Sequence, residues 1–392
     1  MTIHRTTNGL DAERLDGLRA RVERDIEEER YDGAVIIVAR HGEIGLREAI
    51  GFAHRASGRA AQRDDVFRIF SMTKAFTNAL VLNAVDRGIL ALTTPVAEVV
   101  PEFLGTDRFR GMHKPRVTIA HLLTHRAALV PTPTPVPYEQ LGDLSRVITA
   151  IGELDLIGEP GERVQYSPAL AHALLGEVVR RVHGAESFRE VLDRELLEPL
   201  GMTSTRLGAP AAWADRLVPV VARFPAGGWL GPEDIEVMND IVDEDAEMPW
   251  VGCVSSAGDV FRFTEMIRRG GELDGARILS PGILDLATRN HTGDAPNELY
   301  KMLYTAMGWD VPPASVGLGF MLRGEGIFVE PFGTLSTPRT HGNFGAGSSQ
   351  FWIDPERGLT FVCLTSGVME EAANLQRFQR LSDLAQAAVT GL

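Results

Sequence analysis

The N-terminal quarter of the chain carries three patterns of hydrophobic and polar positions. Residues 11–30 repeat apolar positions at helical spacing among alternating charges, which predicts a surface helix packed on one side. Two apolar runs within 33–55 flank a polar His-Gly pair and predict a β-hairpin. Residues 66–90 pass from a short apolar segment into a long apolar helix that ends at Gly88.

Helical patterns dominate the middle of the chain. Residues 117–125 predict a short buried helix, and 166–184 predict a helix that ends at a glycine cap, followed by another at 188–197. The Pro/Thr-rich stretch 130–138 favours a stiff extended loop. The acidic segment 231–247 predicts an exposed loop or a flexible helix.

Strand patterns return after residue 250. Residues 255–271 predict a helix with Ser255 or Ser256 near its cap. The segments expected to form strands are 316–322, 327–330 and 348–366, the last with a turn at 354–358, and 370–389 is expected to form the final helix.

Strands near both ends of the chain, with helices between them, predict a sheet unit built from both termini and an inserted helical domain. A length of 392 residues is typical of two domains. We assign residues 1–76 and 250–392 to the sheet domain and 77–249 to the mostly helical domain. The active site is expected in the cleft between them.

Composition and charge narrow the class of protein. Hydrophobic residues make up 44% and charged residues 23%, which excludes disorder, collagen and coiled coil as descriptions of the whole chain. The formal net charge is −14 and no basic patch offsets it, so we expect no nucleic-acid partner. The ten histidines show no zinc-helix spacing, and we expect neither a metal nor another cofactor.

The N-terminus has no apolar core and no small-residue cleavage site, which argues against a secretory signal peptide. No apolar run approaches the roughly 18 residues of a membrane span. We therefore expect a soluble, cytoplasmic protein with no membrane partner, and the sequence leaves its oligomeric state open. Cys253 and Cys363 lie in apolar surroundings that are typical of buried free thiols.

The main candidate chemistry is the sequence Ser71-Met72-Thr73-Lys74 at the start of the long apolar helix. Residues three apart share a helix face, so Lys74 can reach the hydroxyl of Ser71. Serine is a weak nucleophile until a base takes its proton, and burial together with the helix dipole lowers the pKa of a lysine toward that role. The Ser71 N–H can also donate to an oxyanion.

The choice of lysine at this position is itself informative. The chain has three lysines, Lys74, Lys114 and Lys301, and thirty-six arginines. Arginine does not lose its proton in proteins whereas lysine can, so a lysine here favours a catalytic base. The alternative is an ordinary surface lysine on a helix.

Two other segments offer candidate site residues. The phenol in Tyr166-Ser167-Pro168 could relay a proton between nucleophile and leaving group, or it could simply cap a helix. The small residues of His341-Gly342-Asn343-Phe344 would let a substrate approach the backbone, and a backbone N–H here could complete an oxyanion hole. A glycine-rich turn with a polar histidine would give the same pattern.

In this order, the three segments resemble the serine β-lactamase and penicillin-binding-protein superfamily, and most closely its class C β-lactamase-like esterases and transacylases. The resemblance implies an α+β, β-lactamase-like fold, with an antiparallel sheet flanked by helices and an inserted mostly helical domain. Further segments similar to the family in the same order are 117–129, 160–179, 196–205, 252–263 and 344–366.

The resemblance also implies acyl-enzyme chemistry. Ser71 would attack a carbonyl, with Lys74 and Tyr166 as a coupled acid/base pair. The backbone N–H groups of Ser71 and Phe344 would hold the oxyanion.

The chain departs from the β-lactamase pattern at three places. Pro168 stands where the family has the asparagine of Tyr-x-Asn, and His341-Gly342-Asn343 stands for Lys-Thr-Gly. The family lysine that would pair with a substrate carboxylate is therefore replaced by His341, which is a weaker, titratable cation or a neutral hydrogen-bond donor. These changes argue against a dedicated β-lactamase or D-alanyl peptidase. Arg126-Ala127-Ala128 in place of Thr-Ser-Gly predicts a remodelled loop near the site.

The candidates for contact with substrate come from several parts of the chain. The acidic segment 231–247 and the Pro/Thr loop 130–138 are candidate lids, and the acidic one would disfavour anionic substrates. The substrate-binding candidates are His341, Gly342, Asn343, Trp250 and Tyr138, and Phe70, Met72, Trp229 and Phe344 are further candidate pocket walls.

Our first functional hypothesis is a serine hydrolase that cleaves carboxylic esters of short-chain or aryl type. The second is a biosynthetic transacylase that passes the same acyl group to an alcohol or amine. Either would take a small-molecule ester or acyl donor. Two alternatives are a β-lactamase or D-alanyl peptidase activity and a non-catalytic relative that kept the fold.

Overall fold

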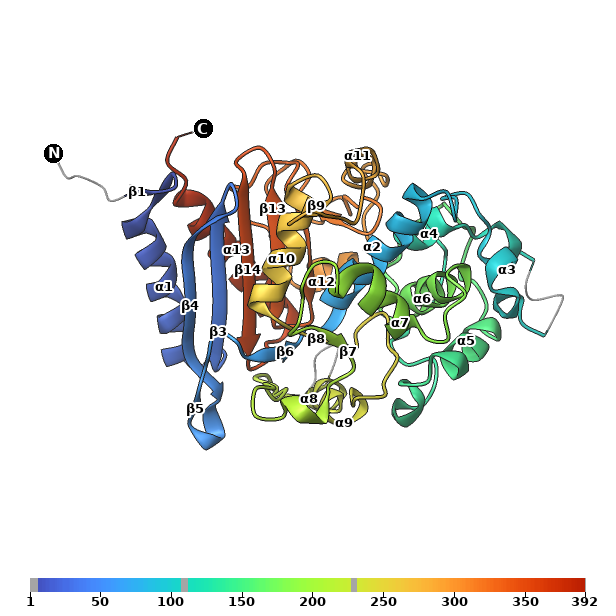
Figure 1. The fold of residues 1–392 in the computed structure, drawn as a ribbon, viewed down its shortest axis with the longest axis horizontal. Coiled ribbons are helices and arrows are strands. Elements are labelled where there is room, and N and C mark those ends of the chain that lie inside the picture. Colours follow the sequence, from blue (N-terminus) through green and yellow to red (C-terminus); the bar gives the residue numbers. More distant parts are fainter. Residues whose placement is uncertain (1–5, 107–111, 227–230, 392) are drawn as a thin grey trace.

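The computed structural model describes residues 6–106, 112–226 and 231–391. Within these residues the chain forms two adjoining lobes, one built on a β-sheet and the other mostly helical (Figure 1). The first and the last of the described residues lie at the outer side of the sheet lobe (Figure 1). The expected α+β fold, an antiparallel sheet flanked by helices, is confirmed.

Seven strands of the described residues form one antiparallel sheet in the order β11-β12-β13-β14-β3-β4-β5. These strands are β3 (Gly33–Arg40), β4 (Glu43–His54), β5 (Arg59–Ala60), β11 (Met321–Leu322), β12 (His341–Gly345), β13 (Ser349–Asp354) and β14 (Leu359–Ser366). The shorter strands are β6 (Val66–Arg68), β8 (Cys253–Ser256) and β7 (Arg206–Leu207) in a second sheet, and the hairpin pairs β1 (Thr6–Thr7) with β2 (Leu10–Asp11) and β9 (Glu272–Leu273) with β10 (Ala276–Arg277).

The long sheet joins the two ends of the chain. Strand β3 pairs with β14 so that Ile36 lies opposite Cys363. Side chains alternate between the faces of a strand, and both faces of β3 are apolar and buried. Val35 and Ile37 belong to the larger hydrophobic core, while Ile36 belongs to a second core on the opposite face.

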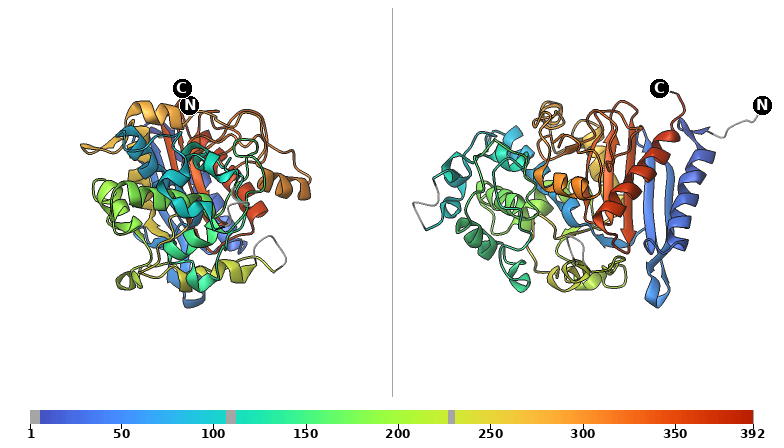
Figure 2. Two further views of the ribbon diagram at one scale, coloured as in Figure 1. Left: turned by 90° about the vertical axis from the view of Figure 1, so that its right-hand side faces the viewer. Right: turned by 180° about the vertical axis from the view of Figure 1, so that it is seen from behind.

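Helices cover both faces of this sheet. Helices α1 (Ala12–Glu27) and α13 (Glu371–Ala387) lie side by side on one face, and α10 (Ala257–Arg268) covers the other (Figures 1 and 2). The side chain of Ser256 caps α10 by accepting the N–H of Asp259, which confirms a serine cap at this end.

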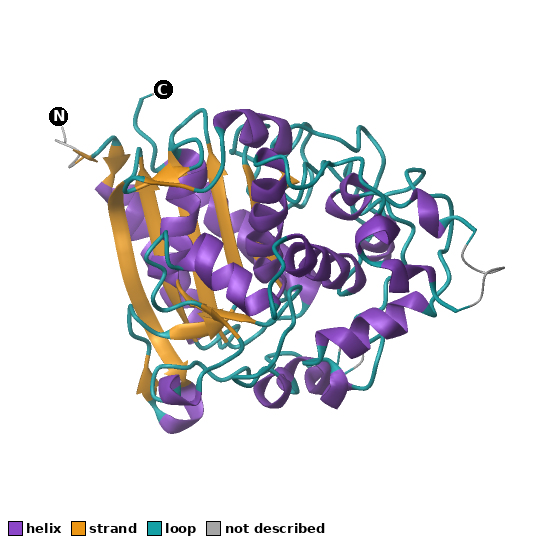
Figure 3. Ribbon diagram, turned by 45° about the vertical axis from the view of Figure 1, so that its right-hand side comes forward, coloured by secondary structure: helices purple, strands orange, loops and turns teal. Residues whose placement is uncertain are grey.

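The remaining helices build the second lobe and its junction with the sheet (Figure 3). They are α2 (Thr73–Asp86), α3 (Val96–Val99), α4 (Ile119–Leu123), α5 (Leu144–Gly152), α6 (Leu170–Val182), α7 (Phe188–Leu192), α8 (Pro232–Glu236), α9 (Met238–Ile241), α11 (Pro281–Ala287) and α12 (Glu298–Ala306). Short 3-10 turns are η1 (Arg55–Ser57), η2 (Phe70–Met72), η3 (Pro101–Leu104), η4 (Lys114–Arg116), η5 (Tyr138–Gln140) and η7 (Ala211–Trp213), and η6 (Asp193–Leu197) is a π turn.

Two of the expected strands are wrong. Of residues 316–322 only the last two form a strand, because the chain turns back at Gly319, which has a φ of 83°. Residues 327–330 form no strand. They lie between Gly326, whose φ is 96°, and Pro331, and neither residue favours a continuous ladder.

The ends of two other expected elements also differ. The helix expected from residue 166 begins only at Leu170, because the residue before Pro168 is biased away from helical backbone. Segment 231–247 contains α8 and α9 and buries Ile235 and Met238 rather than lying fully exposed. The assigned domain boundary at residue 76 falls inside α2, and the division into domains stays a prediction.

Candidate active site

Ser71 lies where the sheet lobe passes into the helical lobe. It is the middle residue of η2, between strand β6 and helix α2. The preceding residue, Phe70, has a φ of 48°, which is rare for a bulky side chain and stores backbone strain. This sharp turn between strand and helix sets Ser71 in the wall of a cavity.

Lys74 stands one helical turn after Ser71, as the spacing predicts. Its Nζ lies 2.9 Å from the Oγ of Ser71 and donates to the backbone oxygen of Trp250, also at 2.9 Å. The side chain is buried, and this burial lowers the pKa of Lys74 to about 7. A large fraction of this lysine is therefore an uncharged amine at neutral pH.

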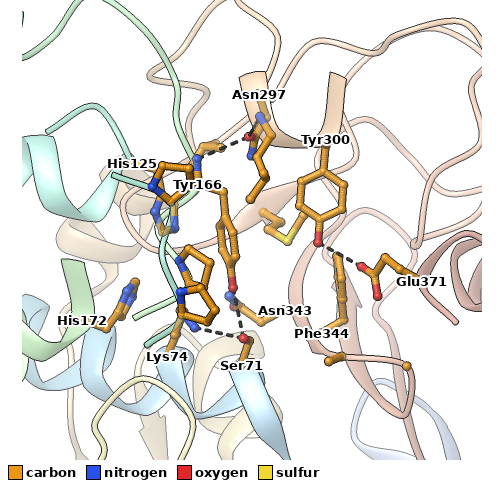
Figure 4. Close-up of a pocket in the computed structure, with 18 of the residues that line it drawn as sticks. Ser71, Lys74, His125, Tyr166, His172, Asn297, Tyr300, Asn343, Phe344 and Glu371 are labelled. Carbon is orange, nitrogen blue, oxygen red and sulfur yellow. Dashed lines mark hydrogen bonds between the residues drawn. The ribbon is translucent and has the colours of Figure 1, made fainter. Parts of the chain in front are cut away.

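Tyr166 reaches the same serine from the other lobe. Its hydroxyl donates to the Oγ of Ser71 at 3.0 Å, and its ring centre lies 5.4 Å from the Nζ of Lys74 (Figure 4). Burial raises the pKa of Tyr166 to about 12, so the phenol keeps its proton at neutral pH. The structure thus brings Ser71, Lys74 and Tyr166 together.

His125 holds the segment that carries Tyr166. Its backbone oxygen accepts the N–H of Gln165 at 2.8 Å, and its Nδ1 accepts the N–H of Ser167 at 3.3 Å. Burial lowers the pKa of His125 to about 3, so the ring is neutral. Sequence reasoning did not select His125, although it lies within the segment 117–129 that resembles the family.

A second buried histidine supports the same wall. His172 lies 5.6 Å from the ring of His125 and hydrogen-bonds the side chain of Asn78 at 2.9 Å. Asn78 in turn donates to the backbone oxygen of Gly319 at 2.8 Å. Burial lowers the pKa of His172 well below its usual range, so this histidine is also neutral.

Strand β12 lies directly against the turn that carries Ser71. A side chain on Gly345 would place its Cβ 2.3 Å from the oxygen of Ile69, so only glycine permits this approach. The hydroxyl of Ser349 donates to the same oxygen at 2.8 Å and fixes the contact. Phe344, which was selected for its N–H, consequently lines the same cavity as Ser71.

The cavity that contains these groups lies between the two lobes. Its empty space, including the open mouth, is about 1360 Å³. Most of its lining is apolar, as is usual for sites that bind small molecules. Of the predicted substrate-binding residues, Asn343 lines this cavity.

The other four predicted substrate-binding residues lie elsewhere. Trp250 packs its ring in the core and offers only its backbone oxygen to Lys74. His341 and Gly342 lie outside the cavity lining, in the part of β12 that pairs with β11. Burial lowers the pKa of His341 to about 4, so it does not replace the family lysine as a cation.

The two expected lids both reach the cavity. Pro131 and Pro133 of the Pro/Thr loop and Ile235 of α8 line it. The hydroxyl of Tyr138 donates to Asp234, which links the two segments to each other instead of facing substrate. Of the further candidate walls, Phe70 and Met72 are buried in the core, and Trp229 lies outside the described residues.

Three polar residues of the cavity gave no signal in the sequence. Asn297 accepts the N–H of Tyr166 at 3.3 Å through its side-chain oxygen. The hydroxyl of Tyr300 donates to Glu371 at 3.0 Å (Figure 4). These residues come from α12, its cap and the start of α13, far along the chain from Ser71. Only the tertiary fold places them at the site.

The described ranges show no group that suggests a metal site or a membrane span. No three His, Cys, Asp or Glu side chains of these residues come together in a way that could hold a metal ion. No helix among them has the length and apolar character needed to cross a membrane. Cys253 and Cys363 are buried free thiols, as expected.

Comparison with known proteins identifies the family of this chain. The family model described as Beta-lactamase matches residues 18–385. The chain belongs to the beta-lactamase family. Esterase EstB of Burkholderia gladioli is 38% identical over 211 residues, which make up 50% of this chain and 53% of EstB. The match therefore spans about half the length of that beta-lactamase-family relative.

Two other proteins are similar to the chain over most of their length. Esterase/beta-lactamase LipL of Mycobacterium tuberculosis (strain ATCC 25618 / H37Rv) is 26% identical, and the match covers 85% of this chain and 76% of LipL. The structure of EstCE1, described as a hydrolase with promiscuous acyltransferase activity, superposes with a TM-score of 0.77 at 23% identity. It covers 97% of this chain and 98% of EstCE1, which shows that the beta-lactamase-family fold is shared.

Proposed function

We propose that this protein is a serine carboxylesterase that works through an acyl-enzyme on Ser71. One observation carries the proposal: the Nζ of Lys74 and the hydroxyl of Tyr166 both lie within hydrogen-bond distance of the Oγ of Ser71, at 2.9 and 3.0 Å, inside a mostly apolar cavity. A nucleophile beside a base, in a space that can hold an ester, is the arrangement that acyl transfer needs.

The two shifted pKa values assign different roles to the partners of Ser71. Lys74 has a pKa of about 7 and is the group that takes the proton of Ser71 as its Oγ attacks the ester carbonyl. Tyr166 has a pKa of about 12 and holds a proton to deliver to the leaving alkoxide. The proton taken by Lys74 then restores the phenol.

The second half of the reaction uses the same groups in reverse. Water attacks the acyl carbonyl and gives up a proton to the Lys74–Tyr166 pair, and the carbon–oxygen bond to Ser71 breaks. The Oγ of Ser71 recovers a proton, and a carboxylic acid leaves. The N–H groups of Ser71 and Phe344 are the proposed donors to the negative oxygen in both halves, because β12 packs against the turn that carries Ser71.

Two features favour esters over β-lactams. Lys74 is the only lysine or arginine among the described residues that line the cavity, and it is already bound to Ser71 and Trp250. His341 is buried and neutral outside the cavity, so no free cation awaits a substrate carboxylate. The relative EstB is named as an esterase, which agrees with this choice, whereas LipL is named as both an esterase and a beta-lactamase.

Acyl transfer to an alcohol or amine is a second candidate. The cavity opens to solvent, which gives an acceptor a route to Ser71, and EstCE1 is described as having promiscuous acyltransferase activity. Transfer differs from hydrolysis only in the molecule that attacks the acyl-enzyme.

The test is intact-mass spectrometry after mixing the protein with p-nitrophenyl butyrate. We expect release of nitrophenol and a butyryl adduct on the wild-type protein, and neither with Ser71→Ala. An adduct that persists in Ser71→Ala would show that Ser71 is not the nucleophile. Release of nitrophenol is then measured with added alcohols and amines. Butyrate as the sole product indicates an esterase, and butyryl esters or amides indicate a transacylase.

A further inference from the structure

One end of the active-site cavity carries an acidic side chain. Glu371 lies in the first turn of α13 and lines the cavity together with Ser71. Its Oε1 accepts a hydrogen bond from Tyr300 at 3.0 Å, and Figure 4 shows this pair on the far side of Tyr300 from Tyr166. A carboxylate in a mostly apolar wall is costly to bury unless something bound there repays the cost.

No positive side chain of the described residues forms an ion pair with Glu371 within 4 Å. Lys74 is bound to Ser71 and Trp250. The guanidinium of Arg377, on the same helix, stacks on the ring of Phe378 at 4.7 Å and donates to Asn374. Burial and, to a smaller extent, the charge of Glu370 raise the pKa of Glu371 to about 7, although the hydroxyl of Tyr300, the N–H of Gly347 and the charge of Arg377 act in the opposite direction.

Aromatic rings adjoin this carboxylate. Tyr300 and Phe344 meet edge to face with ring centres 6.3 Å apart, and Tyr166 lies 6.1 Å from Tyr300. All three residues line the cavity. Aromatic faces attract alkylammonium groups, and a neighbouring carboxylate strengthens the attraction. Neither feature would favour an anionic group.

We propose that Glu371, Tyr300 and Phe344 form a subsite for an alkylammonium group carried by the ester substrate. The inference rests on the proposed esterase function and adds the charge of the substrate to it. Ser71 and this subsite share one cavity, so a single molecule can reach both. The subsite would prefer a cationic ester to a neutral ester of the same shape.

The adjacent residue Glu370 provides a matched control. It lines the same cavity, but its carboxylate accepts the N–H groups of Ala372 and Ala373 and caps α13. Glu370→Gln and Glu371→Gln remove the same charge one residue apart. A general effect of net charge would appear in both variants, whereas the proposed subsite depends on Glu371.

The test compares two pairs of esters that have equal shape and different charge. The cation is on the leaving group in butyrylthiocholine, whose neutral partner is 3,3-dimethylbutyl thiobutyrate. It is on the acyl group in p-nitrophenyl 4-(trimethylammonio)butanoate, whose neutral partner is p-nitrophenyl 5,5-dimethylhexanoate. For at least one pair, we expect the charged-to-neutral ratio of kcat/KM to fall about tenfold or more in Glu371→Gln. The ratio should not fall in Glu370→Gln, because removing the charge of Glu370 lowers the pKa of Glu371 and favours its carboxylate form.

The same ratio distinguishes recognition from a purely structural role. If Glu371 only orders Tyr300, Glu371→Gln would lower kcat/KM for both members of each pair alike, and an unchanged ratio in both pairs would overturn the subsite. Tyr300→Phe keeps the ring and removes the hydroxyl, so it should retain most of the charge preference.

A binding measurement separates this inference from the proposed function. Butyltrimethylammonium contains no ester, and calorimetry should show that it binds the wild-type protein and Glu370→Gln about tenfold or more tightly than Glu371→Gln. Binding with this pattern but no cleavage of any ester would support the alkylammonium subsite and contradict the proposed esterase function. Cleavage of p-nitrophenyl butyrate, with unchanged charged-to-neutral ratios of kcat/KM in Glu371→Gln and no binding of butyltrimethylammonium, would support the esterase function and contradict the subsite.

Discussion

The ring of His125 lies 4.8 Å from the ring of Tyr166, and His125 hydrogen-bonds the backbone on both sides of that tyrosine. These contacts are made to Gln165 and Ser167, which leaves the hydroxyl of Tyr166 free to reach Ser71. We infer that His125 would act as a positioning residue for Tyr166, because its contacts are to the neighbouring backbone and not to Ser71. Small errors in the placement of an acid/base group are costly in enzymes.

We therefore expect His125→Ala to lower kcat for p-nitrophenyl butyrate by about 10- to 100-fold with a smaller change in KM. The effect acts through Tyr166, so His125→Ala should cost little more in a Tyr166→Phe background. The measurement is a double-mutant cycle on kcat, with circular dichroism to verify that each variant is folded. Losses that simply multiply would show that His125 does not act through Tyr166.

The rate should depend on pH because Lys74 must be uncharged to accept a proton. Burial lowers the pKa of Lys74 to about 7, from an ordinary lysine value of about 10.4. The active form is the deprotonated one, so kcat/KM should rise with pH through about 7 and level off above it. His125 and His172 titrate well below this range and should not add to the curve.

Two variants check the origin of that rise. Glu371 also has a raised pKa of about 7, so the profile is repeated in Glu371→Gln with a neutral ester, and the rise should remain. Arginine does not lose its proton in proteins, so Lys74→Arg cannot act as a base, and activity should fall about 10²- to 10⁴-fold at every pH. A flat profile across the neutral range would contradict Lys74 as the base.

The sequence best predicted the site residues that lie close together along the chain. Ser71 and Lys74 are three residues apart on one helical turn, so the spacing in the sequence alone predicts that their side chains meet. Tyr166 was found through the order of motifs along the chain. Glu371 and Tyr300 could not be found in this way, because an ordinary helix start and an ordinary helix tyrosine become a pair only when α12 and α13 meet.

The same limit explains the wrong or displaced assignments. The pattern at 316–322 is apolar enough for a strand, but Gly319 approaches Asn78 so closely that its added Cβ would lie 2.3 Å from the Asn78 side chain. The turn there follows from this tertiary contact. His341 was expected beside substrate, yet it is buried with its ring 5.5 Å from that of Phe320. In both cases a packing partner distant in sequence decided the outcome.

Tyr300 is the bulkiest of five residues that line both the active-site cavity and a neighbouring cavity, and it should limit the length of the acyl chain. The second cavity has an empty space of about 700 Å³, and Tyr300 lines both. Its walls include Val311, Phe328 and Leu375. We expect Tyr300→Ala to join the two spaces and raise kcat/KM for p-nitrophenyl decanoate relative to the butyrate by roughly tenfold.

The control for this prediction is Tyr300→Phe, which keeps the ring between the cavities. The chain-length profile of Tyr300→Phe should follow the wild type from acetate to decanoate. If Tyr300→Phe shifts the profile as Tyr300→Ala does, the hydroxyl and not the bulk of the ring sets the limit.

The buried side chain of Asp25, between α1 and α13, should contribute to stability without affecting catalysis. Asp25 is 0% exposed and forms an ion pair with Arg21 on the same helix. It also lies 3.7 Å from Arg30 and 3.9 Å from Arg380 of α13. Removing one partner of a buried pair leaves the opposite charges uncompensated, so Asp25→Asn should lower the free energy of unfolding by about 3 kcal/mol.

Urea denaturation measures this loss, with Asp16→Asn on the same helix as the matched control. Asp16 is 3.6 Å from Arg19, but its side chain is 68% exposed, so this substitution should change stability by less than about 1 kcal/mol. Both variants should keep the wild-type kcat, because neither aspartate lines the active-site cavity. Equal unfolding midpoints for the two variants would show that Asp25 does not stabilise the packing of α1 on α13.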